Sequence, residues 1–325
     1  MSLKLIEIFA APDQVTAIAD IAKQFQVLGF WKDSMSANET ATCRIVARPE
    51  KQQELIDQLQ GALGTAKPWR ITIMPIEATI PELEETKGKG PSPEQVTREE
   101  LYAEIDRGAR IDNNFLQLVV LSTVVAAIGL LENNVTIVIA AMLIAPLLGP
   151  NIAMAFGSTL GDRELVVRGA TANAAGIALS IACAAAVGLA LPADITAELM
   201  SRTNLGYDNI LLALASGAAG ALSLTTRLSS TLVGVMVGVA LLPPAATLGY
   251  MLGTAQFQLA AGAVSLLVVN IVCINLSAQL VFISKGIKPR TWIDRRAAKQ
   301  SVRISLAATC ALLVILIGIV YWQQN

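Results

Sequence analysis

The chain has 325 residues, of which 54% are hydrophobic and only 15% are charged, where a typical soluble domain carries about 25% charged residues. This composition excludes a disordered chain, and a formal charge of −1 excludes a strongly basic nucleic-acid-binding protein. The chain contains no histidine, and its four cysteines are far apart with no CxxC motif. We therefore expect no metal, no cofactor, no nucleic-acid partner and no enzymatic activity.

Residues 1–80 have ordinary soluble polarity and alternate between strand and helix patterns. Strands are predicted at 3–9, 27–34, 41–48 and 69–78, and amphipathic helices at 12–25 and 49–63. The order strand, helix, strand, strand, helix, strand is typical of the ferredoxin-like fold. We expect an N-terminal α+β ferredoxin-like domain that serves packing or assembly, with ligand sensing as the alternative.

Residues 81–111 form the predicted connector. A polar segment rich in Pro and Gly comes first, and Ser92, Pro93 and Gln95 then fit the N-cap, first-turn and capping-box positions of a helix. The expected helix runs from about residue 93 to 110 and is charged on most sides. We expect it to lie on the membrane surface or to join the soluble domain to the membrane.

The rest of the chain, from 112 to 284 and from 304 to 325, is dominated by apolar runs. Most reach the 17–25 residues that a helix needs to span a bilayer. Buried core helices are the alternative, but seven runs without amphipathic helices to cover them make that alternative weak. The run at 209–224 is short, and a re-entrant segment is its alternative. The seven runs are 115–131, 135–160, 169–191, 209–224, 228–252, 258–284 and 304–322.

The segment 285–303 is rich in Lys and Arg, and the positive-inside rule places it in the cytoplasm. Counting back through the spans places the N-terminal domain in the cytoplasm as well, next to Arg107 and Arg110. The same count places the C-terminus outside. A re-entrant 209–224 would break this parity.

The second and fifth apolar runs resemble each other. Ala141–Pro150 reads AMLIAPLLGP and Gly238–Thr247 reads GVALLPPAAT, so that Pro146 aligns with Pro243. At the same offset Asn173 aligns with Asn270. Three spans per unit is an odd number, and the second unit would therefore enter the membrane from the opposite side. We expect about seven spans, arranged as a 3+3 inverted repeat plus one, with chance similarity as the alternative.

The prolines matter because each one lacks an N–H and leaves the carbonyl four residues earlier without its helical donor. Unpaired carbonyls persist in a membrane only where protein, water or a ligand covers them. Two broken helices at equivalent positions would form a binding site, whereas ordinary proline kinks are the alternative. The predicted substrate-binding residues are Pro146, Gly149, Pro150, Asn151, Asn173, Pro243, Pro244, Thr247 and Asn270.

The chemistry of that site stays open at this point. The amide side chains either line a polar path or hold helices together. No charged side chain lies deep in any span, which argues against a proton relay. Freed carbonyls suit a cation, whereas helix N-termini suit an anion. The GxxxG spacings at Gly157–Gly161 and Gly249–Gly253 predict close helix packing.

The segment Asn133–Gly169 contains A-M-L-I-x-P-L-L-G-P followed by G-x-x-x-G-D. Here the chain resembles the prokaryotic hydrophobic membrane family catalogued as domain-of-unknown-function family 389. The resemblance covers roughly residues 110–255, and members of that family often carry a soluble ferredoxin-like or similar domain. It implies a multi-pass protein of the prokaryotic inner membrane and supplies neither a substrate nor catalytic residues.

The sequence as a whole predicts a transporter or channel-like permease for a small ion or small polar solute, with a cytoplasmic regulatory or assembly domain. The alternative is a non-transporting membrane sensor or scaffold whose soluble domain binds a ligand or partner. The expected partners are the lipid bilayer, the solute and further copies of the chain. A homo-oligomer, for example a trimer, is expected because faces of small residues remain on several spans after one monomer is packed.

Overall fold

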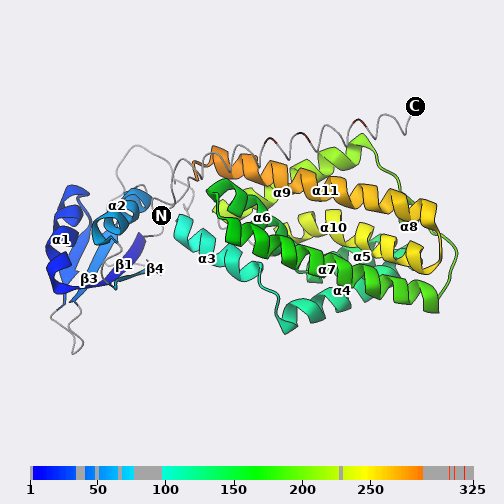
Figure 1. Cartoon of the computed structure of the whole chain (residues 1–325), viewed down its shortest axis with the longest axis horizontal. Helices are drawn as coiled ribbons and strands as arrows, with labels where there is room; N and C mark the ends of the chain where they lie inside the picture. Colours follow the sequence, from blue (N-terminus) through cyan, green and yellow to red (C-terminus); the bar gives the residue numbers. More distant parts are fainter. Residues whose placement is uncertain are drawn as a thin grey trace. The chain divides into compact units, whose positions relative to one another are not determined.

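A computed structural model describes residues 3–33, 41–47, 51–64, 68–76, 97–226 and 230–287, together with 307, 311 and 318. The chain divides into two compact units, Met1–Leu101 and Tyr102–Asn325, which are treated separately below (Figure 1). The predicted basic loop at 285–303 and the predicted last span fall almost entirely outside the described residues.

Unit 1 contains a four-stranded antiparallel sheet with the strand order β2-β3-β1-β4. The central strand β1 pairs with β3 on one side, where Ile6 faces Ile45, and with β4 on the other, where Ile6 faces Ile73. The elements, in chain order, are β1 (Leu3–Ala10), α1 (Val15–Gln24), β2 (Gly29–Lys32), β3 (Ala41–Ala47), α2 (Gln52–Leu63) and β4 (Arg70–Ile76). This order is the one that the sequence predicts.

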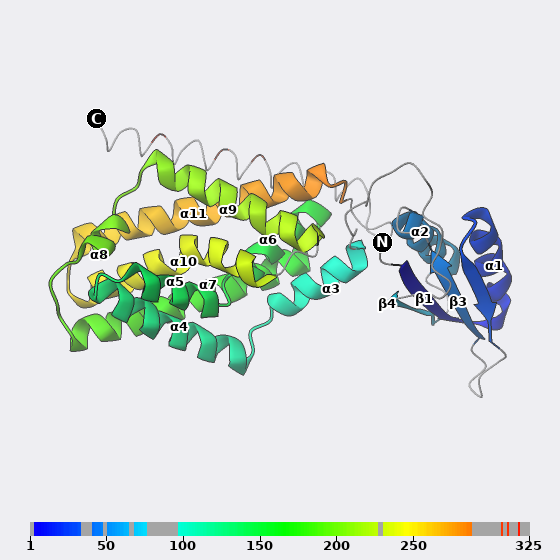
Figure 2. The same ribbon diagram turned by 180° about the vertical axis from the view of Figure 1, so that it is seen from behind.

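The core of unit 1 lies between one face of the sheet and the two helices (Figure 2). Burial alternates residue by residue along β1 and β3, as expected for strands with one covered face. Ile6, Ile8 and Ile45 are fully buried against Ile18 of α1 and Leu55 of α2. Burying these side chains contributes about 1.5–3 kcal/mol each before the entropy of ordering is counted.

The helix α3 (Arg98–Gly108) is the connector between the units in sequence, and the division falls within it. It begins later than predicted, since Thr97 and Glu100 make the capping-box contacts expected of Ser92 and Gln95. The Glu100 carboxylate accepts hydrogen bonds from the Thr97 backbone N–H at 2.9 Å and from the Thr97 hydroxyl at 2.8 Å. Ser92 and Gln95 themselves lie outside the described residues.

Unit 2 is helical in all its described elements. Four of its helices are long and apolar enough to cross a membrane, or five spans if the bent pair α5 and α6 counts as one. The helices are α4 (Asn113–Leu131), α5 (Val135–Ile144), α6 (Leu148–Leu160), α7 (Arg163–Ala190), α8 (Ala197–Ser201), α9 (Tyr207–Thr226), α10 (Ser230–Gly253) and α11 (Phe257–Ser284). The short predicted run at 209–224 belongs to α9, a continuous helix of 20 residues.

The helix α10 lies at the centre of this unit, with α4, α5, α7, α9 and α11 around it (Figures 1 and 2). Its second half is buried throughout, from Ala240 to Met251. The surrounding helices instead expose large apolar side chains, such as Leu121 of α4 and Leu211 of α9, which are 58% and 67% exposed. An apolar surface of this extent is unfavourable in water and suits contact with lipid.

Three helix-to-helix corners share one geometry. At each, one residue adopts a left-handed conformation and the next donates its N–H to the carbonyl five residues back, as in a Schellman motif. The left-handed residues are Asn133 (φ 54°), Gly161 (φ 68°) and Ala255 (φ 58°). Each of the three backbone bonds that follow is 2.8 Å long. These corners need very few residues, and the helices they join are therefore held as antiparallel neighbours.

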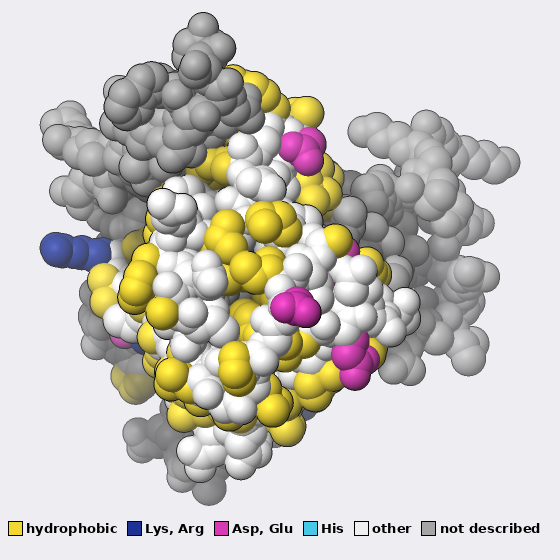
Figure 3. Space-filling view, turned by 90° about the vertical axis from the view of Figure 1, so that its right-hand side faces the viewer, with side chains coloured by type: hydrophobic (Ala, Val, Ile, Leu, Met, Phe, Trp, Pro, Cys, Tyr) yellow, Lys and Arg dark blue, Asp and Glu magenta, His cyan; other side chains and the backbone are white. Residues whose placement is uncertain are grey.

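The end of unit 2 that carries α8 shows acidic side chains among apolar and uncharged surface (Figure 3). Glu132 and Asp194, in connections, and Asp208, in the first turn of α9, are exposed at this end. Arg202 lies there too, but it is paired with Glu198 at 3.3 Å. The start of α7, next to the corner at Gly161, instead carries Arg163 and Arg168 together with Asp162 and Glu164, and Arg168 is paired with Glu164 at 2.6 Å.

Candidate functional site

The first predicted proline break is present. The helix α5 ends at Ile144, Ala145 is extended (φ −67°, ψ 123°), and α6 starts at Leu148 after Pro146 and Leu147. The extended Ala145 is expected, because a residue before proline is pushed out of the helical region. The two helix axes differ in direction by 56°. Pro146 deprives the Met142 carbonyl of its helical donor, whereas Pro150 lies in the first turn of α6, where an N–H has no partner within the helix.

The second predicted break is wrong. The helix α10 continues through Pro243 and Pro244, both of which are buried. The side-chain amide of Asn270 on α11 donates a 2.7 Å hydrogen bond to the Ala240 carbonyl, which is the oxygen that Pro244 leaves without a donor. A neighbouring side chain therefore replaces the donor that the Ala240 carbonyl loses at Pro244.

Asn151 joins α6 to α11. It is fully buried, and its Nδ2 donates to the Leu147 carbonyl at 3.3 Å. Its Oδ1 accepts a 3.1 Å hydrogen bond from Asn275 Nδ2, and Asn275 in turn also donates to the Ile271 carbonyl. Asn275 was not among the predicted site residues, although a polar amide within an apolar run was the available signal. This pair holds the start of α6 against α11.

Asn173 lies on the face of α7 that packs against the start of α6. Gly169, Asn173 and Gly176 follow each other at intervals of four and three residues, so they share one helix face. A methyl group added at Gly169 would lie 2.8 Å from the Pro150 carbonyl oxygen, and one at Gly176 would lie 2.8 Å from Leu147 Cδ2. Asn173, between them, therefore lies on the face of α7 that is next to Leu147 and Pro150.

Two predicted site residues carry a buried oxygen without a hydrogen-bond partner, Asn173 Oδ1 and Thr247 Oγ1. The two residues are 4% and 0% exposed. Most buried polar atoms in proteins are paired, and an unpaired one costs about 1–3 kcal/mol. Asn173 faces the break, whereas Thr247 lies on the continuous helix α10, one turn after Pro243.

Gly149 makes a backbone contact with α3. A methyl group added at Gly149 would lie 2.2 Å from the Gly108 carbonyl oxygen, which is impossible without movement. The end of α3 is also held by charged and polar contacts within unit 2. Asp106 pairs with Arg168 and, at 2.7 Å, with Arg110, and the Tyr102 hydroxyl donates to Asp162 at 2.9 Å. The C-terminal part of α3 is thereby fixed beside the first turn of α6.

The predicted close packing at Gly249 and Gly253 is present. Methyl groups at these positions would lie 2.3 Å from the carbonyl oxygens of Ile181 and Ala185 on α7. A methyl group added at Gly188 of α7 would lie 2.7 Å from the Tyr250 carbonyl oxygen of α10. Backbone therefore meets backbone along this seam, as is typical of helices that pack through small residues in membranes.

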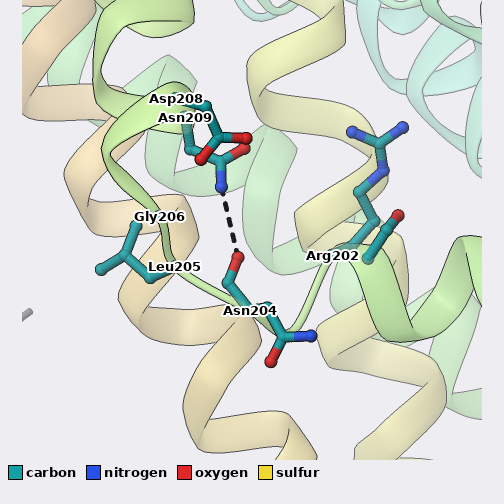
Figure 4. Close-up of a pocket in the computed structure, with 7 residues that line it drawn as sticks. Arg202, Asn204, Leu205, Gly206, Asp208 and Asn209 are labelled. Carbon is teal, nitrogen blue, oxygen red and sulfur yellow. Dashed lines mark hydrogen bonds between the residues drawn. The ribbon is translucent and has the colours of Figure 1, made fainter. Parts of the chain in front are cut away.

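Around the two proline positions, Leu147, Asn151 and Thr247 are fully buried, whereas Pro146, Leu148 and Gly149 are half-buried. A surface hollow lies elsewhere, between α8 and α9, where Asn209 donates to the Asn204 carbonyl at 3.3 Å (Figure 4). A second hollow lies at Arg163, Val167 and Arg168, at the start of α7. Within the described ranges, no three His, Cys, Asp or Glu side chains come together as metal ligands.

Comparison with known proteins identifies relatives but no activity. Residues 142–276 match the family described as "Domain of unknown function (DUF389)". Over 323 residues, the chain is 31% identical to "Uncharacterized protein MJ0678" of Methanocaldococcus jannaschii, with 99% of this chain and 100% of that protein covered. No solved structure matches the chain.

Proposed function

Since the chain belongs to the DUF389 family, which has no assigned activity, we propose on physical grounds that it is a membrane permease for a small ion or small polar solute. One observation carries the proposal. A span is broken at Pro146, and the neighbouring helix α7 carries the buried Asn173, whose Oδ1 has no hydrogen-bond partner. No catalysis, metal or cofactor is part of this proposal.

The proposed architecture has seven spans, of which the first six form a 3+3 inverted repeat. Two corners support it, because Gly161 between α6 and α7 and Ala255 between α10 and α11 are both left-handed. Equivalent helix pairs also meet at equivalent places. Thr123 of α4 donates to Ser180 of α7 at 3.0 Å, and a methyl group at Gly217 of α9 would lie 2.3 Å from Ser277 Oγ of α11.

The proposed location is the inner membrane of a prokaryotic cell, with the N-terminal domain in the cytoplasm. Charge supports this orientation, because Lys and Arg are enriched on the cytoplasmic side of membrane proteins. Arg163 and Arg168 lie at the start of α7, and the sequence 285–303 adds further cations. The end that carries α8 is acidic instead (Figure 3).

The proposed role of unit 1 is regulation or assembly, as a ferredoxin-like domain. Its strand order β2-β3-β1-β4 supports that fold. The sheet face opposite the helices carries Leu5, Phe9, Val46 and Met74, all of them partly exposed, and Trp31, which is 54% exposed. This face suits contact with a further copy, in line with a homo-oligomer, for which a trimer remains a guess at the number.

A flux assay with purified protein in liposomes tests the permease. A panel of small anions, cations and neutral solutes is compared between the wild type, Pro146→Ala and Pro243→Ala. We expect flux of at least one solute and a large loss in Pro146→Ala, which gives the Met142 carbonyl a helical donor again. Pro243→Ala is the matched control, because α10 is already continuous. Equal rates in wild type and folded Pro146→Ala would show that the break is a kink without function.

The competing function is a non-transporting sensor or scaffold. The burial of Leu147, Asn151 and Thr247 favours it, because these side chains have no access to solvent. If the liposome panel shows no flux for any solute while unit 1 binds a ligand or partner, the scaffold replaces the permease.

A further inference from the structure

The first turn of α3 is docked on a polar face of α2, and these contacts lie within unit 1. Arg98 pairs with Asp57 at 2.8 Å, and its backbone N–H donates to Gln53 Oε1 at 2.8 Å. The side-chain amides of Gln53 and Gln60 donate to Glu99 at 3.2 and 3.4 Å. Gln53, Asp57 and Gln60 lie four and three residues apart, so they share one face of α2. Hydrogen bonds and an ion pair therefore hold this end of α3.

This docking is weaker than the apolar core of unit 1. The side chains of Asp57 and Glu99 are 33% and 21% exposed, so water competes for their bonds. Two buried atoms at the same contact, Gln60 Oε1 and Arg98 Nε, have no hydrogen-bond partner in the protein. Exposed polar bonds and unpaired buried atoms make a contact easier to open than a packed core. The first turn of α3 can therefore leave α2 while the sheet stays folded.

The second half of the same helix lies along α6, and these contacts lie within unit 2. The ring centroids of Tyr102 and Phe156 are 6.4 Å apart, and the Tyr102 hydroxyl donates at 2.9 Å to Asp162, just after the end of α6. Gly108 lies against Gly149 in the first turn of α6, because a methyl group added at Gly149 would be 2.2 Å from the Gly108 carbonyl oxygen. The two helices therefore run antiparallel, and the end of α3 lies beside the break.

Asp106 fixes this half of α3. Its side chain is 11% exposed and pairs with Arg168 of α7 and, at 2.7 Å, with Arg110. A carboxylate with so little access to water depends on its charged partners. Gly108 follows two residues later, so the pairing of Asp106 keeps Gly108 against Gly149.

The two docked ends depend on each other because α3 is short. It has 11 residues, and isolated helices shorter than about 12–15 residues are marginal in water. Helix formation is cooperative, so a turn that is held on one partner stabilises the turns that follow it. Loss of the docking at Arg98 therefore weakens the helix on which Asp106 and Gly108 lie. The coupling passes through the helix itself.

Resting on the regulatory role proposed above for unit 1, we propose that α3 is a latch that couples unit 1 to the break at Pro146. While the first turn of α3 is docked on α2, Gly108 stays against Gly149 and shields the first turn of α6. When that turn leaves α2, the rest of α3 loosens and the first turn of α6 becomes more accessible to water. A signal that reaches unit 1 thereby controls the site of the proposed permease.

Thiol labelling of the full chain in detergent tests the latch. The native cysteines are replaced, and a cysteine is placed at Leu148, which is half-buried next to Gly149. Its rate of reaction with a small water-soluble thiol reagent is the readout. Asp57→Ala changes only α2, in unit 1, and removes the ion pair with Arg98. We expect labelling at position 148 to become at least about fivefold faster, as is typical of coupling between two sites.

Two further variants keep the labelling result interpretable. Gln53→Ala removes the acceptor of the Arg98 backbone N–H and should also speed labelling, so the test stands if Asp57→Ala does not fold. Glu54→Ala, on the exposed side of α2, is the matched control and should label as the wild type does. Equal rates in the wild type and the folded variants, or an equal rise in Glu54→Ala, would overturn the latch.

Interrupting α3 tests whether the helix carries the effect. Ala103 and Glu104 are exposed in the middle of α3, and glycine at both positions weakens the helix without removing a contact at either end. In this background labelling at position 148 should already be fast, and Asp57→Ala should not change it further. A rise caused by Asp57→Ala that persists in full would show that the coupling does not pass through α3.

The liposome panel separates this inference from the permease proposal. Flux that depends on Pro146, with unchanged labelling at position 148 in Asp57→Ala, would overturn the latch and leave the permease standing. Labelling that responds to Asp57→Ala, without flux of any solute, would support the latch and overturn the permease.

Discussion

The Asn270 amide lies 2.7 Å from the Ala240 carbonyl oxygen, and this contact joins α11 to the point where α10 passes through two consecutive prolines. Both residues are buried, at 5% and 3% exposure, so water does not compete for the bond. A carbonyl that loses its helical donor inside a membrane protein must find another one. Asn270 is therefore a structural residue of α10, although it belongs to another helix.

Replacing Asn270 with Ala removes this donor and leaves the Ala240 carbonyl buried and unpaired. We expect a loss of about 1–3 kcal/mol in the free energy of unfolding. Thermal unfolding of the purified protein in detergent measures it. Ser265→Ala on the same helix is the control, because the Ser265 hydroxyl only bonds back to Ala261 at 3.0 Å. Indistinguishable unfolding temperatures for the two variants would contradict the structural role of Asn270.

Gly149→Ala tests the contact between α3 and α6. The added methyl group would lie 2.2 Å from the Gly108 carbonyl oxygen, so α3 has to move. Crowding of this kind costs about 1–3 kcal/mol. Hydrogen exchange of α3 amides should become faster in the variant. Gly61→Ala in α2 has nothing within 4 Å of its added methyl group and should leave exchange unchanged or slower, as expected for an unstrained Gly to Ala change in a helix. Slow exchange of α3 in Gly149→Ala would rule out the steric argument.

The pair between Lys4 and Glu100 makes unit 1 sensitive to acid. Burial alone would raise the pKa of Glu100, but hydrogen bonds from Lys4 and Thr97 outweigh it and hold the pKa below its ordinary value of 4.5. A carboxyl with a lowered pKa contributes stability that is present above the unfolded-state value and is lost as the pH falls through the folded-state value. Protection of β1 and α3 amides should therefore fall below about pH 4.5.

Glu100→Gln separates this effect from general acid unfolding. The variant lacks the charge and should show lower protection at neutral pH, with a smaller further loss on acidification. The loss at neutral pH should be about 2 kcal/mol, typical of a hydrogen bond to a charged group. Hydrogen exchange measured at pH 7 and pH 4, corrected for intrinsic rates, provides the readout. Identical pH dependence in both proteins would exclude Glu100 as the titrating group.

The proposed orientation is tested by cysteine labelling in intact cells. With the native cysteines replaced, a cysteine at Ser201, in the acidic end, should react with an impermeant reagent added outside. A cysteine at Gln300, in the basic segment, should react only after the cells are opened. Labelling of position 300 from outside would reverse the topology and remove the support for a cytoplasmic N-terminal domain.

Much of the fold could be predicted because local pattern and burial agree. Alternating strands such as β1 and β3 carry a period of two, and α2 ends at Gly64, whose φ of 60° suits a glycine. The ends of the helices were harder to predict where a helix extends beyond its apolar run into polar residues. Asp162 caps α7, with its side chain accepting from Leu165 N–H at 3.1 Å, and the helix therefore includes the charged residues 163 and 164.

The candidate site was harder to predict, because a proline shows which carbonyl is freed but not which group satisfies it. Pro146 and Pro243 look alike in sequence, yet one breaks a span and the other lies in a continuous helix. In the continuous helix, the carbonyl that the adjacent Pro244 frees has a partner on another helix, Asn270, whose position depends on the packing of α11. The contact between Gly108 and Gly149 was likewise invisible, since nothing local in the sequence pairs these two glycines.

The corner at Ala255 has a practical consequence. Gly161 adopts the left-handed conformation without a side-chain penalty, whereas Ala255 adopts it with φ 58° and a Cβ atom that this conformation disfavours by about 1–2 kcal/mol. Glycine at position 255 would relieve that strain while making the unfolded chain more flexible, so a net gain of a few tenths to about 1 kcal/mol remains. Ala255→Gly is therefore a reasoned starting point for a thermostabilised variant suited to experimental structure determination.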